Sequence, residues 1–214
     1  AKIAADKAGI IKSGVPVVTA PQDPEAENVI RTAAANAGAR LVSVGREVTW
    51  IPRGATADGQ RLEVRCEAEG AGMATVLDVL VHLVGPHQEA NAATAVGVLC
   101  VLRAAGWAIE PAAIEAGLAA ARWPGRFERL GDGPPVIVDG AHNPHAATAL
   151  VAALDERYPG RRRIFVLGAS RDKDVRGILA QLLPGAAGVI VTRSEHPRAM
   201  PAADLAGAVA DFGA

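Results

Sequence analysis

The chain has 214 residues, half of them apolar and only 3% aromatic, and a formal net charge of −1. This length suits one large domain or two small ones, and the dispersed charge offers no basic surface for nucleic acid or an anionic membrane. The longest apolar stretch, residues 92–102, is too short to cross a bilayer, and no secretory signal opens the chain. We therefore expect a cytoplasmic protein that binds neither nucleic acid nor membrane.

The first 122 residues predict a βαβ unit followed by a hairpin, a further strand and two helices. The βαβ unit favours a parallel strand pair with a right-handed crossover. Cys66 and Cys100 lie in apolar or strand-like surroundings and are expected to be buried thiols. In chain order, we expect a helix at 1–11, a strand at 15–20, a helix at 23–38, a strand at 40–44, hairpin strands at 48–51 and 61–65 joined by a longish loop, a strand at 74–83, and helices at 87–105 and 110–122.

Residues 131–135, Gly-Asp-Gly-Pro-Pro, have the composition of a linker. After them strands and helices alternate regularly. The expected strands are 136–139, 163–168 and 187–193, and the expected helices are 144–158, 174–183 and 201–210. Three successive βα units predict an α/β fold with a doubly wound parallel sheet. We therefore expect one domain over 1–130 and a second over 136–214.

The first candidate site follows the strand at 136–139, whose β-branched residues suit a strand covered on both faces. Gly140 permits a tight turn, and Asn143 can cap the next helix. Ligands of open α/β sheets bind at the carboxyl ends of strands, which is where Asp139 and His142 are placed. The alternative for Asp139 is a structural one, in which its carboxylate caps the turn that follows.

Arg126 follows Gly125, which would let the backbone approach a ligand closely. Its guanidinium can bind phosphate oxygens with two hydrogen bonds. The alternative is an ion pair between Arg126 and either Glu128 or Asp139.

Two further candidates lie earlier in the chain. Gln88 and Asn91 are three residues apart on an expected helix, beside His87, and their amides could recognise a purine edge or simply cap the helix. Lys7 is surrounded by small and apolar residues, and a half-buried lysine can react with CO2 to give a carbamate, which is an oxygen ligand for Mg²⁺. The alternative for Lys7 is an ordinary surface lysine.

Polar loops follow the last two strands at the same predicted sheet edge as Asp139. The first contains Ser170, Asp172, Lys173 and Asp174, and the second is residues 193–198. Three such loops in register favour a cleft wall, although charged loops can also be solvated connections. The chain contains no Gly-x-x-x-x-Gly-Lys-Ser/Thr phosphate loop.

In chain order, five stretches resemble folylpolyglutamate synthase, a family related to the Mur peptidoglycan ligases and often bifunctional in bacteria as dihydrofolate synthase. The ordered set spans nearly the whole chain, and its most specific part is Asp-Gly-Ala-His-Asn-Pro. The stretches are residues 6–12 (DKAGIIK), 87–92 (HQEANA), 125–128 (GRFE), 138–144 (VDGAHNP) and 172–174 (DKD).

The resemblance implies the end of a Mur-ligase-type central ATPase domain followed by a Rossmann-like parallel α/β domain. It implies ATP-dependent ligation of L-glutamate to a folate or to dihydropteroate through an acyl phosphate, with Mg²⁺, a monovalent cation and a monomeric enzyme. Lys7 matches a carbamylated lysine that helps to organise Mg²⁺. Asn91, Arg126 and Asp139 match residues that hold ATP, and His142 matches a histidine near the reacting phosphate.

The family's phosphate loop and metal-binding glutamate belong before residue 1, and its last domain runs beyond three βα units. We therefore expect a piece of a longer protein that does not ligate glutamate alone. Two alternatives stay open. One is a non-catalytic nucleotide- or glutamate-binding pseudo-ligase, and the other is a different Mur-type amino-acid ligase.

Overall fold

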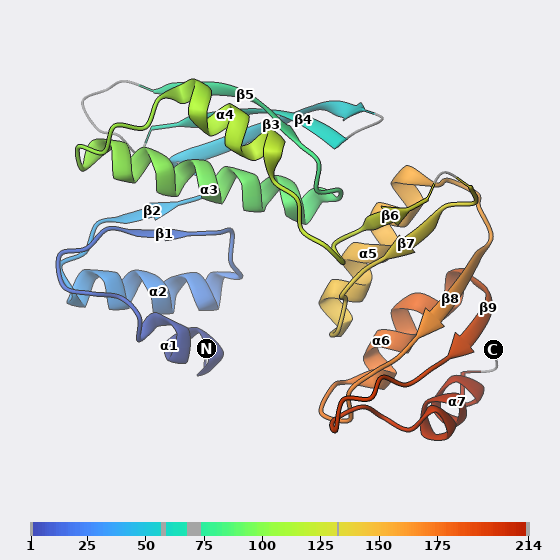
Figure 1. The fold of residues 1–214 in the computed structure, drawn as a ribbon. Helices are drawn as coiled ribbons and strands as arrows, with labels where there is room; N and C mark the ends of the chain where they lie inside the picture. The colour runs from blue at the N-terminus through green and yellow to red at the C-terminus, as the bar shows by residue number, and fades with distance from the viewer. Residues whose placement is uncertain (1, 57–58, 68–73, 132, 213–214) are drawn as a thin grey trace. The chain divides into compact units, whose positions relative to one another are not determined.

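The computed structural model describes residues 2–56, 59–67, 74–131 and 133–212, and the chain forms two compact units, residues 1–123 and 124–214 (Figure 1). The linker was expected later, at 131–135, and its Asp132 lies outside the described residues. The earlier division has a structural reason. Strand β6 (Glu128–Leu130) pairs antiparallel with β7 (Val136–Val138), which attaches the segment before the expected linker to the second unit.

The predicted βαβ unit is confirmed at the start of the first unit. Strands β1 (Val17–Thr19) and β2 (Leu41–Ser43) run parallel and are connected by helix α2 (Pro24–Asn36). Helix α1 (Lys2–Ala8) packs against α2 and ends before Gly9, earlier than the helical pattern suggested. Residue 1, at the start of that expected helix, lies outside the described residues.

The rest of the first unit is a three-stranded antiparallel sheet covered by two helices. Its order is β3 (Val48–Thr56), β4 (Gly59–Cys66) and β5 (Thr75–Val81). The hairpin strands are longer than predicted, because a register shift between Pro52 and Gly54 absorbs the glycine without ending β3. The tip of the hairpin, 57–58, lies outside the described residues.

Helices α3 (Pro86–Ala104) and α4 (Pro111–Ala120) pack on this sheet, α3 mainly against β3 and α4 against β5. An added Cβ on Gly97 of α3 would lie 3.1 Å from Val48 Cγ2, so the helix approaches the sheet closely. Both cysteines are buried thiols, as predicted. The residues buried in this core are Val42, Val44, Val48, Leu62, Val64, Cys66, Leu77, Val79, Val81, Ala92, Ala93, Val96, Cys100 and Ile114.

The second unit alternates strands and helices, as the pattern predicted. After β7 it contains helix α5 (Pro144–Arg157), strand β8 (Arg163–Leu167), helix α6 (Val175–Leu182), the 3-10 turn η1 (Leu183–Gly185), strand β9 (Ala186–Val191) and helix α7 (Ala202–Ala210). Strands β8 and β9 pair in parallel, and α6 and α7 contribute most of the core beside them.

The surroundings of β7 differ from the expectation of a strand buried on both faces. Its partner in the described part of the chain is β6, a strand that the sequence pattern did not predict. Val136 and Val138 are 55% and 40% exposed, so β-branched composition alone overstated the burial. In the described part of the chain, no helix is both long enough and apolar enough to cross a membrane.

Candidate functional site

The end of β7 and the turn before β6 form one hydrogen-bonded junction in the second unit. Asp139 holds it together. One of its carboxylate oxygens accepts a bond from the backbone N–H of Phe127 and the other from that of Ala141, both at 2.8 Å. The N–H of Gly140 donates to the carbonyl of Gly125, also at 2.8 Å. The structural role considered for Asp139 is thus confirmed, since its carboxylate caps the turn that follows through the N–H of Ala141, and the same carboxylate also binds the loop that carries Phe127.

Arg126 lies within this junction, between two residues in the left-handed region. Gly125 has a φ of 70° and Phe127 a φ of 45°. The Arg126 guanidinium lies against Gly140, where an added Cβ would come within 2.7 Å of its Nη1 atom. This packing of Arg126 on Gly140 was not predicted, and the approach of the Gly125 backbone to a ligand stays a prediction.

A second carboxylate, Glu128, closes the same turn from the other side. Its Oε2 atom accepts a 2.7 Å bond from the N–H of Gly125. The sequence analysis considered Glu128 only as an ion-pair partner of Arg126. The Gly-Arg-Phe-Glu spacing, a carboxylate three residues after a glycine, is the signal that could have indicated this turn.

His142 and Asn143 follow the junction at the start of α5. The Asn143 side chain accepts a 2.8 Å bond from the N–H of Ala146, which confirms the predicted helix cap. His142 is exposed, and its Nδ1 lies 2.9 Å from the carbonyl oxygen of Gly140. Because a carbonyl only accepts, Nδ1 carries the proton in this arrangement, and in a neutral ring Nε2 is left as an acceptor.

The predicted loops after β8 and β9 are joined to each other. The N–H of Arg171 donates to the carbonyl of Arg198 at 2.9 Å, and Ser170 forms a β-bridge with Ala199. Asp174 accepts a 2.9 Å bond from the N–H of Gly177 and so caps α6. These bonds join the two loops into one polar rim, whose residues are mostly exposed to solvent.

Asp172 sits between two cations on this rim. Its carboxylate lies 3.5 Å from Lys173 Nζ and 4.0 Å from Arg198 Nη1. A backbone hydrogen bond to Asp172 lowers the pKa of this exposed carboxyl below its ordinary 3.8, and the two cations lower it further.

The rim and the start of α5 adjoin each other. An added Cβ on Gly177 would come within 2.6 Å of Pro144 Cγ, so the first turns of α5 and α6 are in close contact. The second unit therefore gathers Arg126, Asp139 and His142 at one end of the αβ array, with the Ser170–Asp174 loop beside it. Helix N-termini and arginine favour anionic ligands, which suits phosphate or carboxylate groups.

The first unit holds the remaining predicted residues. Asn91 Nδ2 donates to Gln88 Oε1 at 3.0 Å, and Gln88 Nε2 lies 3.2 Å from His87 Nε2. The predicted neighbourhood of Gln88 and Asn91 is confirmed. The N-cap residue of α3, Gly85, makes no side-chain cap bond, and the role of Gln88 and Asn91 toward a purine stays a prediction.

Gln60 was missed by sequence reasoning. It is buried on β4, and its Nε2 donates to the carbonyls of Leu83 and Gly85 at 3.0 and 3.2 Å. It thereby fixes the loop from which His87 and Gln88 start. No local pattern in the sequence pairs Gln60 with a loop 23 residues away.

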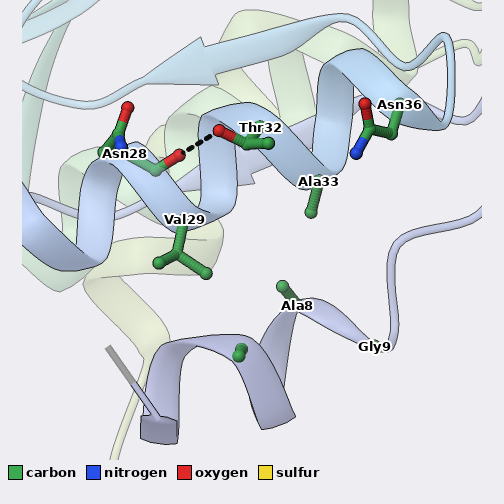
Figure 2. A pocket seen from close by; sticks show the side chains of 8 residues that line it. Ala8, Gly9, Asn28, Val29, Thr32, Ala33 and Asn36 are labelled. Carbon is green, nitrogen blue, oxygen red and sulfur yellow. Dashed lines mark hydrogen bonds between the residues drawn. The ribbon is translucent and has the colours of Figure 1, made fainter.

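Lys7 is exposed at the end of α1, a helix with no buried residues, so the ordinary surface lysine is confirmed and the half-buried alternative is wrong. Among the described residues, the main packing partner of α1 is α2. A cavity of about 440 Å³ separates the two helices (Figure 2), lined mostly by small side chains such as Ala8 and Ala33. Within the described ranges, no group of three or more His, Cys, Asp or Glu residues is arranged to hold a metal ion.

Comparison with known proteins identifies the relatives of this fold. Residues 125–214 match the family model described as Mur ligase, glutamate ligase domain. Dihydrofolate synthase/folylpolyglutamate synthase of Bacillus subtilis is 33% identical over 205 residues, which are 95% of this chain and 46% of that protein. The Mycobacterium tuberculosis protein of the same name is 35% identical over 214 residues, 96% of this chain and 43% of that protein.

A solved structure agrees with these sequence matches. Mycobacterium tuberculosis folylpolyglutamate synthase, complexed with ADP and AMPPCP, superposes with a TM-score of 0.86 and 34% identity, covering 98% of this chain and 47% of that one. The chain thus spans about half the length of the relatives it matches. The chain is therefore a member of the Mur ligase family, homologous over nearly its whole length to folylpolyglutamate synthases, with the glutamate ligase domain in residues 125–214.

Proposed function

We propose that this chain takes part in the ATP-dependent ligation of L-glutamate to a folate or to dihydropteroate. The observation that carries the proposal is the junction at the end of β7, where Arg126 is set against Gly140 beside the start of α5. It places a cation and a helix N-terminus together in a domain whose relatives are glutamate ligases.

The reaction proceeds in two steps. The γ-phosphoryl group of ATP is transferred to a carboxylate oxygen of the folate or dihydropteroate, and ADP leaves. The amine of L-glutamate then attacks the acyl carbon, an amide forms, inorganic phosphate leaves and a proton is released. Catalysis of this kind consists mainly of positioning and of neutralising phosphate charge.

The residues of the chain have separate roles in this proposal. Arg126 neutralises phosphate oxygens, and Asp139 keeps the junction in shape while its remaining lone pairs face a nucleotide. Asn91, in the first unit, is a separate candidate for a nucleotide contact through its amide. His142, with Nδ1 held by the Gly140 carbonyl, has Nε2 available to take the proton that the glutamate amine must lose.

The cations of Lys173 and Arg198 on the rim are the candidates for binding the carboxylates of L-glutamate through charge-assisted hydrogen bonds.

Magnesium belongs to this proposal through its usual role of shielding ATP phosphates. The described residues do not supply a complete set of oxygen donors, and Lys7 is a single exposed amine that would first have to become a carbamate. We therefore assign no step to the metal. The monovalent cation, the monomeric state and the cytoplasmic location stay predictions.

The test is ADP release with Mg-ATP, L-glutamate and either dihydropteroate or tetrahydrofolate. It is run on this chain and on a version extended at its N-terminus to include a Gly-Lys-Ser phosphate loop. Turnover in the extended version supports the ligase, and no turnover in either version contradicts the folate assignment. Turnover by the short chain would instead contradict the expectation that the phosphate loop is required.

An Arg126→Ala substitution provides the matched variant. We expect a loss of nucleotide affinity of roughly tenfold to a hundredfold, since a charge-assisted contact to phosphate is removed. Arg129→Ala, at an exposed position on β6, is the control and should retain the affinity.

A further inference from the structure

We propose that Glu128 is a positioning residue for Arg126. It acts by holding the backbone of the turn that directs the guanidinium toward Gly140. The functional consequence rests on the proposed nucleotide contact of Arg126, whereas the structural consequence can be measured without any ligand.

The turn is held from both sides of Arg126. On one side, the Glu128 carboxylate accepts the N–H of Gly125 at 2.7 Å. On the other, the Asp139 carboxylate accepts the N–H of Phe127 at 2.8 Å. Both residues next to Arg126 in sequence therefore have their N–H groups bound to carboxylates, and both bonds are partly buried.

These two hydrogen bonds matter because the backbone at Phe127 is strained. Among the described residues, Phe127 is the one residue other than glycine with a positive φ. A bulky side chain in this region is strained and persists only where the surroundings enforce it. Stacking of the Phe127 ring on Tyr158, with centroids 6.4 Å apart, anchors the side chain. The Glu128 bond anchors the preceding residue, so that Arg126 is fixed at both ends.

Glu128 itself is well placed for this role. It begins β6 and pairs in register with Val138, so its backbone is tied to the strand that leads into Asp139. The two carboxylates therefore reach the turn from neighbouring strands of one ladder. Loss of the Glu128 carboxylate would leave the N–H of Gly125 without this acceptor, and the turn could relax away from its left-handed conformation.

The first experiment uses NMR to measure the hydrogen-exchange rates of the backbone amides in this turn of the chain. In Glu128→Ala we expect the amides of Gly125 and Phe127 to exchange at least roughly tenfold faster and the Arg126 Nε resonance to shift. Glu128→Gln keeps an acceptor oxygen and should restore most of the protection. Glu156→Ala, at an exposed glutamate on α5, is the control and should leave these amides unchanged.

The second experiment measures the Kd for ADP in whichever version of the protein turns over, using Arg126→Ala, Glu128→Ala and the double variant. If Glu128 acts through Arg126, the double variant binds no more weakly than Arg126→Ala alone. If Glu128 acts independently, the two losses multiply, which would overturn the proposal.

The two experiments separate failure of this inference from failure of the proposed function. Unchanged exchange and an unchanged Arg126 resonance in Glu128→Ala would overturn the positioning role, whatever the ligase activity. Unchanged ADP affinity in Arg126→Ala would contradict the nucleotide role of Arg126. Faster exchange in Glu128→Ala would then still support the positioning of the arginine.

Discussion

The two units of this chain are held together in different ways. Among the residues that the structure describes, fourteen buried side chains form the core of the first unit, whereas the cluster beside β8 and β9 has five. In the second unit, the loops that carry the candidate site are instead held by hydrogen bonds from carboxylates to backbone N–H groups, above all those of Asp139. Apolar packing thus stabilises a scaffold, while directed polar bonds set the geometry of a site.

The sheet faces show the same difference. In the first unit, the inward residues of β4, such as Leu62 and Val64, are fully buried. In the second unit, Ile164 and Val166 on β8 and Ile190 on β9 are 69%, 65% and 56% exposed. We therefore expect the two units to respond to different kinds of substitution.

The largest effect is expected in the core of the first unit. Leu62→Ala should lower the free energy of unfolding by about 2–5 kcal/mol, because a fully buried side chain leaves a cavity. Urea unfolding followed by tryptophan fluorescence reports on this unit, since all three tryptophans lie between residues 50 and 123. Val76→Ala, on the exposed face of the same sheet, should change it by less than about 1 kcal/mol. Equal effects would refute the described core.

The next largest effect is expected at the junction. Asp139→Ala should destabilise the second unit by about 2 kcal/mol, because the N–H groups of Phe127 and Ala141 lose a charged acceptor. Hydrogen exchange of the second unit should detect this loss, while the tryptophan transition of the first unit stays in place. Asp204→Ala on α7 is the control. A shift of the tryptophan transition would mean that the units do not unfold separately.

A smaller loss of folding free energy is expected at the helix starts, and one helix start in each unit allows a comparison. Asn143→Ala removes a cap whose side chain bonds the N–H of Ala146, and it should cost about 1 kcal/mol. Asp23→Ala, at the start of α2, should cost only a few tenths of a kcal/mol, since Asp23 makes no cap bond through its side chain. Denaturant unfolding of both variants checks this order. The reverse order would show that Asp23 caps α2 in solution.

The smallest effect concerns pH. The pKa of Asp172 lies below 3.8 in the folded chain, so its ionised form contributes stability above that pH and the contribution is lost as pH falls through the lowered pKa. Asp172→Asn should therefore make the stability of the second unit less dependent on pH below 3.8. The measurement is urea unfolding at about pH 6 and about pH 3. A variant with the wild-type pH dependence would rule out this contribution.

Much of the architecture could be predicted because it depends on local patterns. Helical periodicity, the capping Asn143 and the spacing of Gln88 and Asn91 lie within a few residues of one another, and the structure confirms each. The parallel pair β1 and β2 could also be predicted, because a strand–helix–strand unit of this length favours that pairing.

Other features depend on residues distant in sequence. Strand β6 has only three residues, which is too short for an alternation of apolar and polar residues to indicate a strand. Its pairing with β7 defines it. The sequence left Lys7 either on the surface or half-buried, because burial depends on what packs against α1. The chemistry of Glu128 was visible in sequence, whereas its acceptance of the Gly125 N–H was not.

By itself, the sequence determined the order and type of most of the elements, β6 excepted, and the resemblance to folate ligases. These features depend on residues close together in sequence, through their backbone preferences, the spacing of their apolar side chains and helix capping. Only the tertiary structure decided which amides Asp139 and Glu128 bind, where Arg126 lies and where the second unit begins. Those outcomes require two strands to pair and two loops to meet, and strand pairing across a turn is a non-local interaction that no short sequence pattern encodes.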